Sequence, residues 1–181
     1  IFNKIILHKE VWRMLSNSFK NNKIPNAFIF SGEDGVGKEA HAIEFSALLN
    51  CKRIDEDGFA CGDCRSCLKI KSFQHEEIHF IHPTRSPKNK TDMVLDQKTI
   101  DDLNKNYKLK SSNPYHKISI NNSTTIPINS IRSLKKKLFY SKTDENWSVV
   151  IIFDSEKLCI PKAESANSLL KILEEPPERT L

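Results

Sequence analysis

A glycine-rich loop directly after a short apolar segment constrains the fold of this chain more than any other feature. The apolar segment is Ala27–Phe30, and the loop that follows it fits the pattern G-x-x-x-x-G-K, with Gly32, Gly35, Gly37 and Lys38 as its key residues. In P-loop proteins such a loop joins a buried strand to a helix. Its backbone N–H groups surround phosphate oxygens, and its lysine reaches the outer phosphates. These residues are therefore candidate nucleotide-binding residues, with an ordinary glycine turn as the alternative.

Two positions of the predicted nucleotide site differ from those of a working ATPase. A working loop carries Ser or Thr after the lysine, because that hydroxyl binds Mg²⁺, whereas this chain carries Glu39. Asp154 ends a strongly apolar run and matches the second carboxylate that holds Mg²⁺ in P-loop ATPases. The residue after it is Ser155, which cannot act as a base. The sequence therefore predicts a degenerate nucleotide site that includes Asp154, and it leaves open a loop retained only for its turn geometry.

Four cysteines form a compact segment after the predicted helix that follows the loop. Cys51, Cys61, Cys64 and Cys67 have the spacing C-x9-C-x2-C-x2-C. Two-residue spacings let thiolates converge on one ion, and four cysteines around zinc form a closed structural site. Four free thiols and an iron–sulfur cluster are the alternatives. The fifth cysteine, Cys159, stands alone, and we expect it to be a small buried residue.

The order of apolar patterns predicts an α/β fold, in which a parallel sheet is flanked by helices. Most of the stretch from 83 to 125 is polar and irregular, which is typical of an insertion or a long loop. We assign 88–125 as a variable insertion with a short helix at 99–107 and a weak strand at 118–120. The other predicted strands are 27–30, 78–81 and 148–153, and the other predicted helices are 11–21, 38–49, 128–138 and 163–173.

The segment from His75 to His79 matches H-E-x-x-H, the pattern of zinc proteases. That pattern requires a helix that places both histidines on one face. Here apolar and polar residues alternate as in a strand, in which residues four apart are about 13 Å apart. We expect no protease site at this position.

Net charge and hydropathy restrict the class of protein. The formal net charge of +5 favours a polyanionic neighbour such as DNA or a nucleotide, although weakly. No apolar run approaches the ~20 residues that cross a bilayer, and the first residues do not form a signal peptide. We therefore expect a cytoplasmic protein without membrane contact. The basic residues of the helix at 128–140 form either a solvated face or a contact with DNA phosphates, and they are Arg132, Lys135, Lys136 and Lys137.

Three segments in order carry a resemblance to a known family: KIPNAFIFSGEDGVGKEA, CGDCRSC and ANSLLKILEEPP. Together they resemble the clamp-loader subunits of bacterial DNA polymerase III, in particular the delta-prime type, which is related to gamma and tau. The resemblance implies an AAA+ domain over 1–181 that is incomplete at its C-terminus, with a zinc module at 51–67. It also implies DNA replication as the process, with gamma/tau and delta subunits, the sliding clamp and primed DNA as partners.

The same resemblance distinguishes two kinds of subunit. Gamma-like motor subunits keep Thr or Ser after the loop lysine and an Asp-Glu pair after the second strand. Delta-prime-like subunits often lose both features and act without hydrolysing ATP. Glu39 and Ser155 place this chain with the second kind. An active ATPase motor of the gamma/tau type is the alternative.

Overall fold

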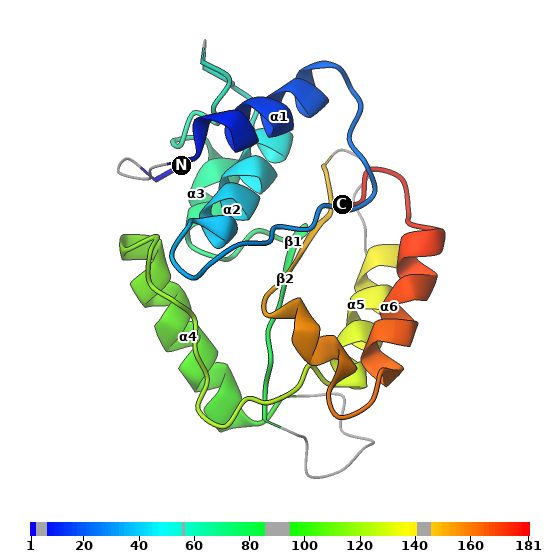
Figure 1. Ribbon diagram of the computed structural model, residues 1–181. Coiled ribbons are helices and arrows are strands. Elements are labelled where there is room, and N and C mark those ends of the chain that lie inside the picture. The colour runs from blue at the N-terminus through cyan, green and yellow to red at the C-terminus, as the bar shows by residue number, and fades with distance from the viewer. Residues whose placement is uncertain (3–6, 56, 86–94, 141–145) are drawn as a thin grey trace.

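The computed structural model describes residues 1–181 except 3–6, 56, 86–94 and 141–145. In the described part, six α-helices and a 3-10 helix surround two short strands (Figure 1). The helices are α1 (Lys9–Lys20), α2 (Lys38–Asn50), α3 (Arg65–Lys71), α4 (Gln97–Ser112), α5 (Ile128–Tyr140), η1 (Ser155–Cys159) and α6 (Glu164–Glu174), and the strands are β1 (Ile78–Ile81) and β2 (Val149–Ile152).

The two strands form a parallel pair, as the sequence predicted for them. The register pairs Ile78 with Val149 at one end and Ile81 with Ile152 at the other. The opposite edge of β2 bonds the end of the chain, where the amide of Val150 donates to the carbonyl of Leu181 at 2.7 Å. Both edges of β2 are therefore occupied.

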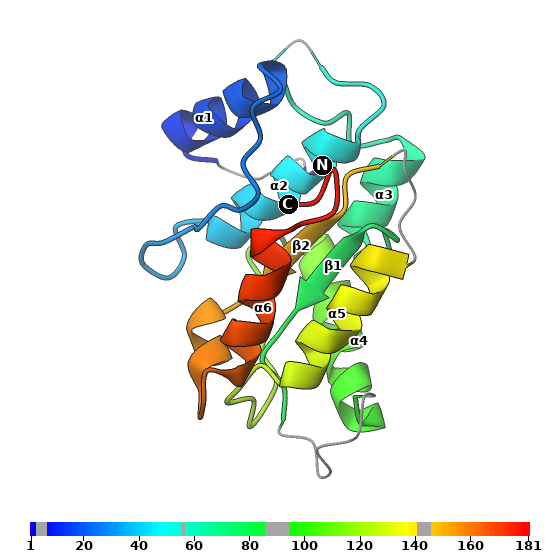
Figure 2. The ribbon, with the colours of Figure 1, turned by 90° about the vertical axis from the view of Figure 1, so that its right-hand side faces the viewer.

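Helices cover both faces of the sheet (Figure 2). Val149 and Ile151 belong to a core cluster with α1, α2 and α3, whereas Val150 and Ile152 pack against a second cluster built by α5 and α6. The alternation follows from strand geometry, because successive side chains point to opposite faces. An apolar residue at every position of β2 is thus explained by burial on both sides.

The predicted strand at 27–30 is wrong. These residues have an irregular backbone, and Ile29 is 91% exposed. Phe28 still contributes to the core, since its ring meets the ring of Phe45 edge-on at 5.7 Å. A strand requires a hydrogen-bonded neighbour, and this segment forms no ladder with another described segment. The weak strand expected at 118–120 is likewise irregular.

The segment assigned as an insertion is more regular than the sequence indicated. Its first part, 88–94, lies outside the described residues. After it, α4 is a full helix of 16 residues, longer than the expected 99–107. Cys159 was expected to be buried, but it is exposed at the end of η1 because Leu158 is the residue of that turn that enters the core. No helix in the described part of the chain has the length and apolar character needed to cross a bilayer.

Candidate functional site

The predicted phosphate loop has the backbone that its glycines permit. Gly32, Gly35 and Gly37 have φ of +145°, +85° and +84°, a region that side chains with a Cβ rarely adopt. Gly37 is the N-cap residue of α2, and Lys38 is the first residue of that helix. The loop therefore presents the start of a helix, where partial positive charge favours anions.

The side chain of Lys38 is bonded to the loop itself. Its ammonium donates to the carbonyl of Gly32 at 2.6 Å and to the carbonyl of Glu33 at 2.8 Å. A phosphate-binding role for this lysine requires that it exchange these carbonyls for phosphate oxygens.

Glu39 occupies the position of the Mg²⁺-binding hydroxyl, and its carboxylate is paired with a lysine from α4. The ammonium of Lys110 bonds one oxygen of Glu39 and also donates to the carbonyls of Pro114 (3.2 Å) and His116 (2.8 Å). Lys110 is only 1% exposed. Its three oxygen partners satisfy all three donors of a lysine ammonium, so the charge is buried without an unsatisfied donor.

A second ion pair joins the same two regions. The ammonium of Lys117 lies 3.1 Å from a carboxylate oxygen of Asp34 in the loop. Lys117, by its hydrogen bond and charge, holds the pKa of Asp34 below its ordinary value, and Lys38 adds to the effect. The pKa of Lys117 is raised by Asp34 first and then by the charges of Asp154 and Glu39. Lys117 therefore lies within the field of Asp34, Glu39 and Asp154.

Asp154 follows β2 as the N-cap residue of η1 and has a left-handed backbone conformation, with φ of +48°. Its carboxylate pairs with Lys157 of the following 3-10 turn at 3.1 Å. Ser155 begins that turn, so no carboxylate directly follows Asp154. The Mg²⁺ side of the predicted site thus consists of carboxylates already paired with lysines, and the residues present do not fit a Mg-nucleotide.

His41 is a further residue of this region that the sequence did not indicate. Its Nδ1 lies 2.8 Å from the carbonyl of Gly37, and its Nε2 accepts from the amide of His8 at 2.9 Å. These partners require a neutral ring with the proton on Nδ1. His41 therefore fixes the chain before α1 to the start of α2.

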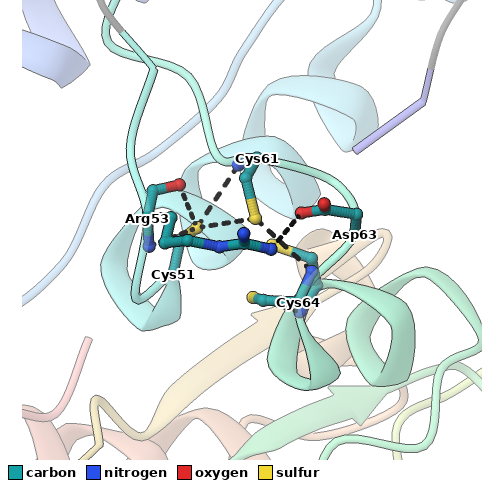
Figure 3. Close-up of polar contacts among 6 residues, drawn as sticks. Cys51, Arg53, Cys61, Asp63 and Cys64 are labelled. Carbon is teal, nitrogen blue, oxygen red and sulfur yellow. Dashed lines mark hydrogen bonds and ion pairs between the residues drawn. The ribbon is translucent and has the colours of Figure 1, made fainter.

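The four cysteines predicted as metal ligands meet in space. The sulfur atoms of Cys51, Cys61, Cys64 and Cys67 all lie within 4.8 Å of one another, and the first two are 3.5 Å apart (Figure 3). Tetrahedral zinc with Zn–S bonds of about 2.3 Å separates its sulfurs by roughly 3.8 Å. The cluster therefore fits a structural metal ion. Within the described part of the chain, it is the one group of three or more candidate ligands that converge in this way.

Backbone amides support the sulfurs. The amide of Cys61 donates to the sulfur of Cys51 at 3.3 Å, and the amide of Cys64 donates to the sulfur of Cys61 at 3.4 Å. Burial opposes ionisation of the Cys64 thiol, but the Cys67 amide and neighbouring hydrogen bonds outweigh it and lower its pKa to about 6. Burial raises the pKa of Cys67. At the rim, Arg53 pairs with Asp63 at 3.0 Å.

The H-E-x-x-H segment does not form the helix that the zinc-protease pattern requires. His79 lies in β1, whereas His75 precedes the strand and bonds the hydroxyl of Ser66 at 2.9 Å. Burial lowers the pKa of both histidines.

A third histidine, His82, follows β1 and is almost completely buried. Its Nε2 lies 2.9 Å from the hydroxyl of Tyr107 in α4, and its ring stacks on Phe153 with centroids 4.2 Å apart. Burial lowers its pKa to about 3. This neutral ring connects α4 to the end of β2, next to Asp154.

The basic side chains of α5 all lie on the surface. Arg132, Lys135, Lys136 and Lys137 are exposed, and the buried face of the same helix carries Ile131, Leu134 and Leu138. This arrangement agrees with a solvated face and with a DNA contact, and the choice between them stays a prediction.

Comparison with known proteins places the chain among DNA polymerase III subunits. A family model described as "DNA polymerase III, delta subunit" matches residues 7–181. The delta-prime subunit of Bacillus subtilis is 22% identical over 97% of this chain, and that of Buchnera aphidicola subsp. Baizongia pistaciae is 26% identical over 88%. The tau/gamma subunit of Haemophilus influenzae is 27% identical over 98%.

The chain spans only part of these relatives: 40% and 37% of the two delta-prime subunits and 20% of the tau/gamma subunit. Identities to the two types overlap, so they do not separate a delta-prime from a gamma/tau type. The family match itself covers nearly the whole chain. The chain therefore belongs to the DNA polymerase III family of delta and delta-prime-like clamp-loader subunits, which is related to gamma and tau.

Proposed function

We propose that this chain is part of a non-hydrolytic, delta-prime-type subunit of the DNA polymerase III clamp loader, which helps to load the sliding clamp on primed DNA in the cytoplasm. The observation that carries the proposal is the pair between Glu39 and Lys110. It fills the position at which a motor subunit binds Mg²⁺ through a hydroxyl. Without that metal, the γ-phosphate lacks the charge neutralisation that its transfer requires.

The proposed architecture is an AAA+ domain over 1–181 with a zinc module at 51–67. Cys51, Cys61, Cys64 and Cys67 would hold the zinc, and their fit to a tetrahedral ion supports this. Zinc bound by four thiolates has no open position for a substrate, so it would stabilise the fold and take no part in catalysis. The residues of the degenerate nucleotide site would be Gly32, Gly35, Gly37, Lys38 and Asp154.

The proposed partners are the gamma/tau and delta subunits, and through them the sliding clamp and primed DNA. An active motor of the gamma/tau type is the second candidate. The glycine conformations of the loop, the lysine at its end and the carboxylate after β2 favour it. The absence of a hydroxyl at position 39 and of a carboxylate at position 155 opposes it.

The test is clamp loading by a loader reconstituted from its own subunits, with the full-length protein carrying Lys38→Ala. A non-hydrolytic subunit predicts a loading rate within ~2-fold of the wild type. The same substitution in the loader's motor subunit should abolish loading, which is the control. A loss of ~10-fold or more from Lys38→Ala in this protein, equivalent to ~1.4 kcal/mol of activation free energy, would support the motor.

A further inference from the structure

Residues 97–117, which comprise α4 and the five residues after it, contact the region of the phosphate loop. We call them the α4 segment. Two of its lysines pair with the loop region: Lys110 with Glu39, and Lys117 with Asp34. These contacts join residues 71 and 83 positions apart. Neither carboxylate is required by the nucleotide-binding pattern. Asp34 is at a variable position of G-x-x-x-x-G-K, and Glu39 is at the position where a working loop has a hydroxyl.

We propose that Lys110 and Lys117 supply the positive charge that Mg²⁺ supplies in a working P-loop site, so that the α4 segment excludes Mg-nucleotide from the loop. This inference rests on the proposed function and gives a reason why Mg-nucleotide would not bind. In it, two lysines of the α4 segment take the place of the metal ion.

The burial of Lys110 is the first argument. Its ammonium is enclosed and has three oxygen partners, one charged and two from its own segment. For Mg²⁺ to bind Glu39, the ammonium must leave its only charged partner. A buried cation that loses its partner is strongly destabilising. Metal binding at this position therefore competes with the native fold of the segment.

The balance of charge is the second argument. Three carboxylates of this region each already have a lysine ammonium as partner, and Lys38 is bonded to carbonyls of the loop. The ion pairs are Lys110–Glu39, Lys117–Asp34 and Lys157–Asp154. A triphosphate entering this region would meet the carboxylate of Glu39 without a metal to neutralise it.

The arrangement also argues against a metal-free anion site made of these lysines. Lys110 is turned toward Glu39 and toward carbonyls of its own loop, and Lys38 toward carbonyls of the phosphate loop. An anion would have to displace each of these acceptors. The ammonium groups of Lys38, Lys110 and Lys117 thus all have oxygen partners within the protein.

The experiment compares four full-length proteins: the wild type, Glu39→Thr, Lys110→Met and the combination of both substitutions. Mg-ADP is titrated into each protein by calorimetry, because it probes the metal side without turnover. Thermal unfolding shows which variants are folded. Glu39→Thr restores the missing hydroxyl, whereas Lys110→Met removes the internal cation with little change in shape. Lys108→Met, at an exposed position of the same helix, is the matched control.

We expect Mg-ADP to bind the double variant at least ~10-fold more tightly than either single variant, which corresponds to about 1.4 kcal/mol. Glu39→Thr should gain no further affinity from Lys108→Met. Equal affinity of Glu39→Thr and the double variant would overturn the inference, as would a folded double variant without binding.

A separate route remains if Lys110→Met prevents folding. Lys117 is largely exposed, so Lys117→Ala does not disturb the core. Combined with Glu39→Thr, it should bind Mg-ADP at least ~3-fold more tightly than Glu39→Thr alone, and equality would overturn the inference. The two failures can be told apart. If this inference is wrong, Glu39→Thr alone binds Mg-ADP as tightly as the variants that also lack a lysine. If the proposed function is wrong, the wild-type protein hydrolyses ATP.

Discussion

The two ends of α2 differ in the side chains that they offer to a metal ion. At its C-terminal end, Cys51 is the C-cap residue and one of four sulfur atoms that converge within 4.8 Å. At its N-terminal end, Glu39 replaces the hydroxyl that would bind Mg²⁺, and a lysine ammonium occupies its carboxylate. One end of the helix has a complete set of donor atoms for a metal, whereas the other satisfies its charges internally. The phosphate loop thus keeps the backbone conformation of its motif, whereas residue 39 has a paired carboxylate in place of the hydroxyl.

Replacement of Cys67, one of the four proposed metal ligands, should have the largest effect on stability. Structural zinc contributes on the order of 10 kcal/mol to the folding of small metal modules, and Cys67 is completely buried. We expect Cys67→Ala to lose bound zinc and to lower Tm by at least ~10 °C. Metal analysis and thermal unfolding of the full-length protein measure both effects.

The control for that experiment is Cys159→Ala, which changes an exposed cysteine outside the cluster. It should leave zinc content and Tm unchanged. One zinc per chain in Cys67→Ala would show that the cluster is not the metal site.

Breaking the ion pair between Lys110 and Glu39, at the other end of α2, should reduce stability less. Lys110→Met removes a buried cation and leaves Glu39, whose side chain is 33% exposed. Breaking a buried pair costs ~3–5 kcal/mol, and partial exposure of the carboxylate reduces the expected loss to about 2–3 kcal/mol. Urea unfolding of Lys110→Met beside Lys108→Met measures it. A loss no larger than that of Lys108→Met would mean that the pair does not anchor the α4 segment.

The pH dependence of stability should come partly from His82, which joins α4 to the sheet. Its pKa is lowered from 6.5 to about 3 by burial, so the unfolded chain binds more protons than the folded chain between these values. Stability therefore decreases as pH falls below 6.5, by up to about 2 kcal/mol at pH 5. Urea unfolding at pH 7 and pH 5 should show a smaller difference in His82→Gln than in the wild type. The same difference in both proteins would exclude His82 as the source.

The smallest effect is expected from the exposed pair at the loop. Lys117 and Asp34 are 61% and 87% exposed at their side chains, and exposed ion pairs contribute little to stability. Lys117→Ala should change Tm by no more than about 1–2 °C. A larger loss would show that this lysine has a structural role besides its charge.

The sequence predicted those parts of the structure that depend on local pattern. The apolar runs identified β1 and β2, and the periodic apolar positions identified α1, α5 and α6, which ends before Pro176 as expected. The cysteine cluster was predicted from spacing, because Cys61, Cys64 and Cys67 are only three positions apart from one another in turn, and the structure brings Cys51, ten positions earlier, to the same point. The short helix α3 was not predicted, since its seven residues carry too little periodicity.

The features that the sequence did not predict depend on contacts between distant residues. Nothing near Lys110 distinguishes it from the other lysines of a polar stretch, and its partner Glu39 lies 71 positions away. The segment 27–30 has the composition of a strand, yet a strand forms only where a neighbouring strand pairs with it, and composition does not show that neighbour. The degenerate site predicted from Glu39 and Ser155 stays a prediction, and the lysines that pair with Glu39 and Asp34 could be found only in three dimensions.

The most direct test of the account is the steady-state hydrolysis of Mg-ATP by the purified full-length protein, measured beside its Lys38→Ala variant. If the phosphate loop is retained without its chemistry, the two proteins should release phosphate at the same background rate. A wild-type rate clearly above that background, abolished by Lys38→Ala, would contradict the account and identify the protein as a motor subunit.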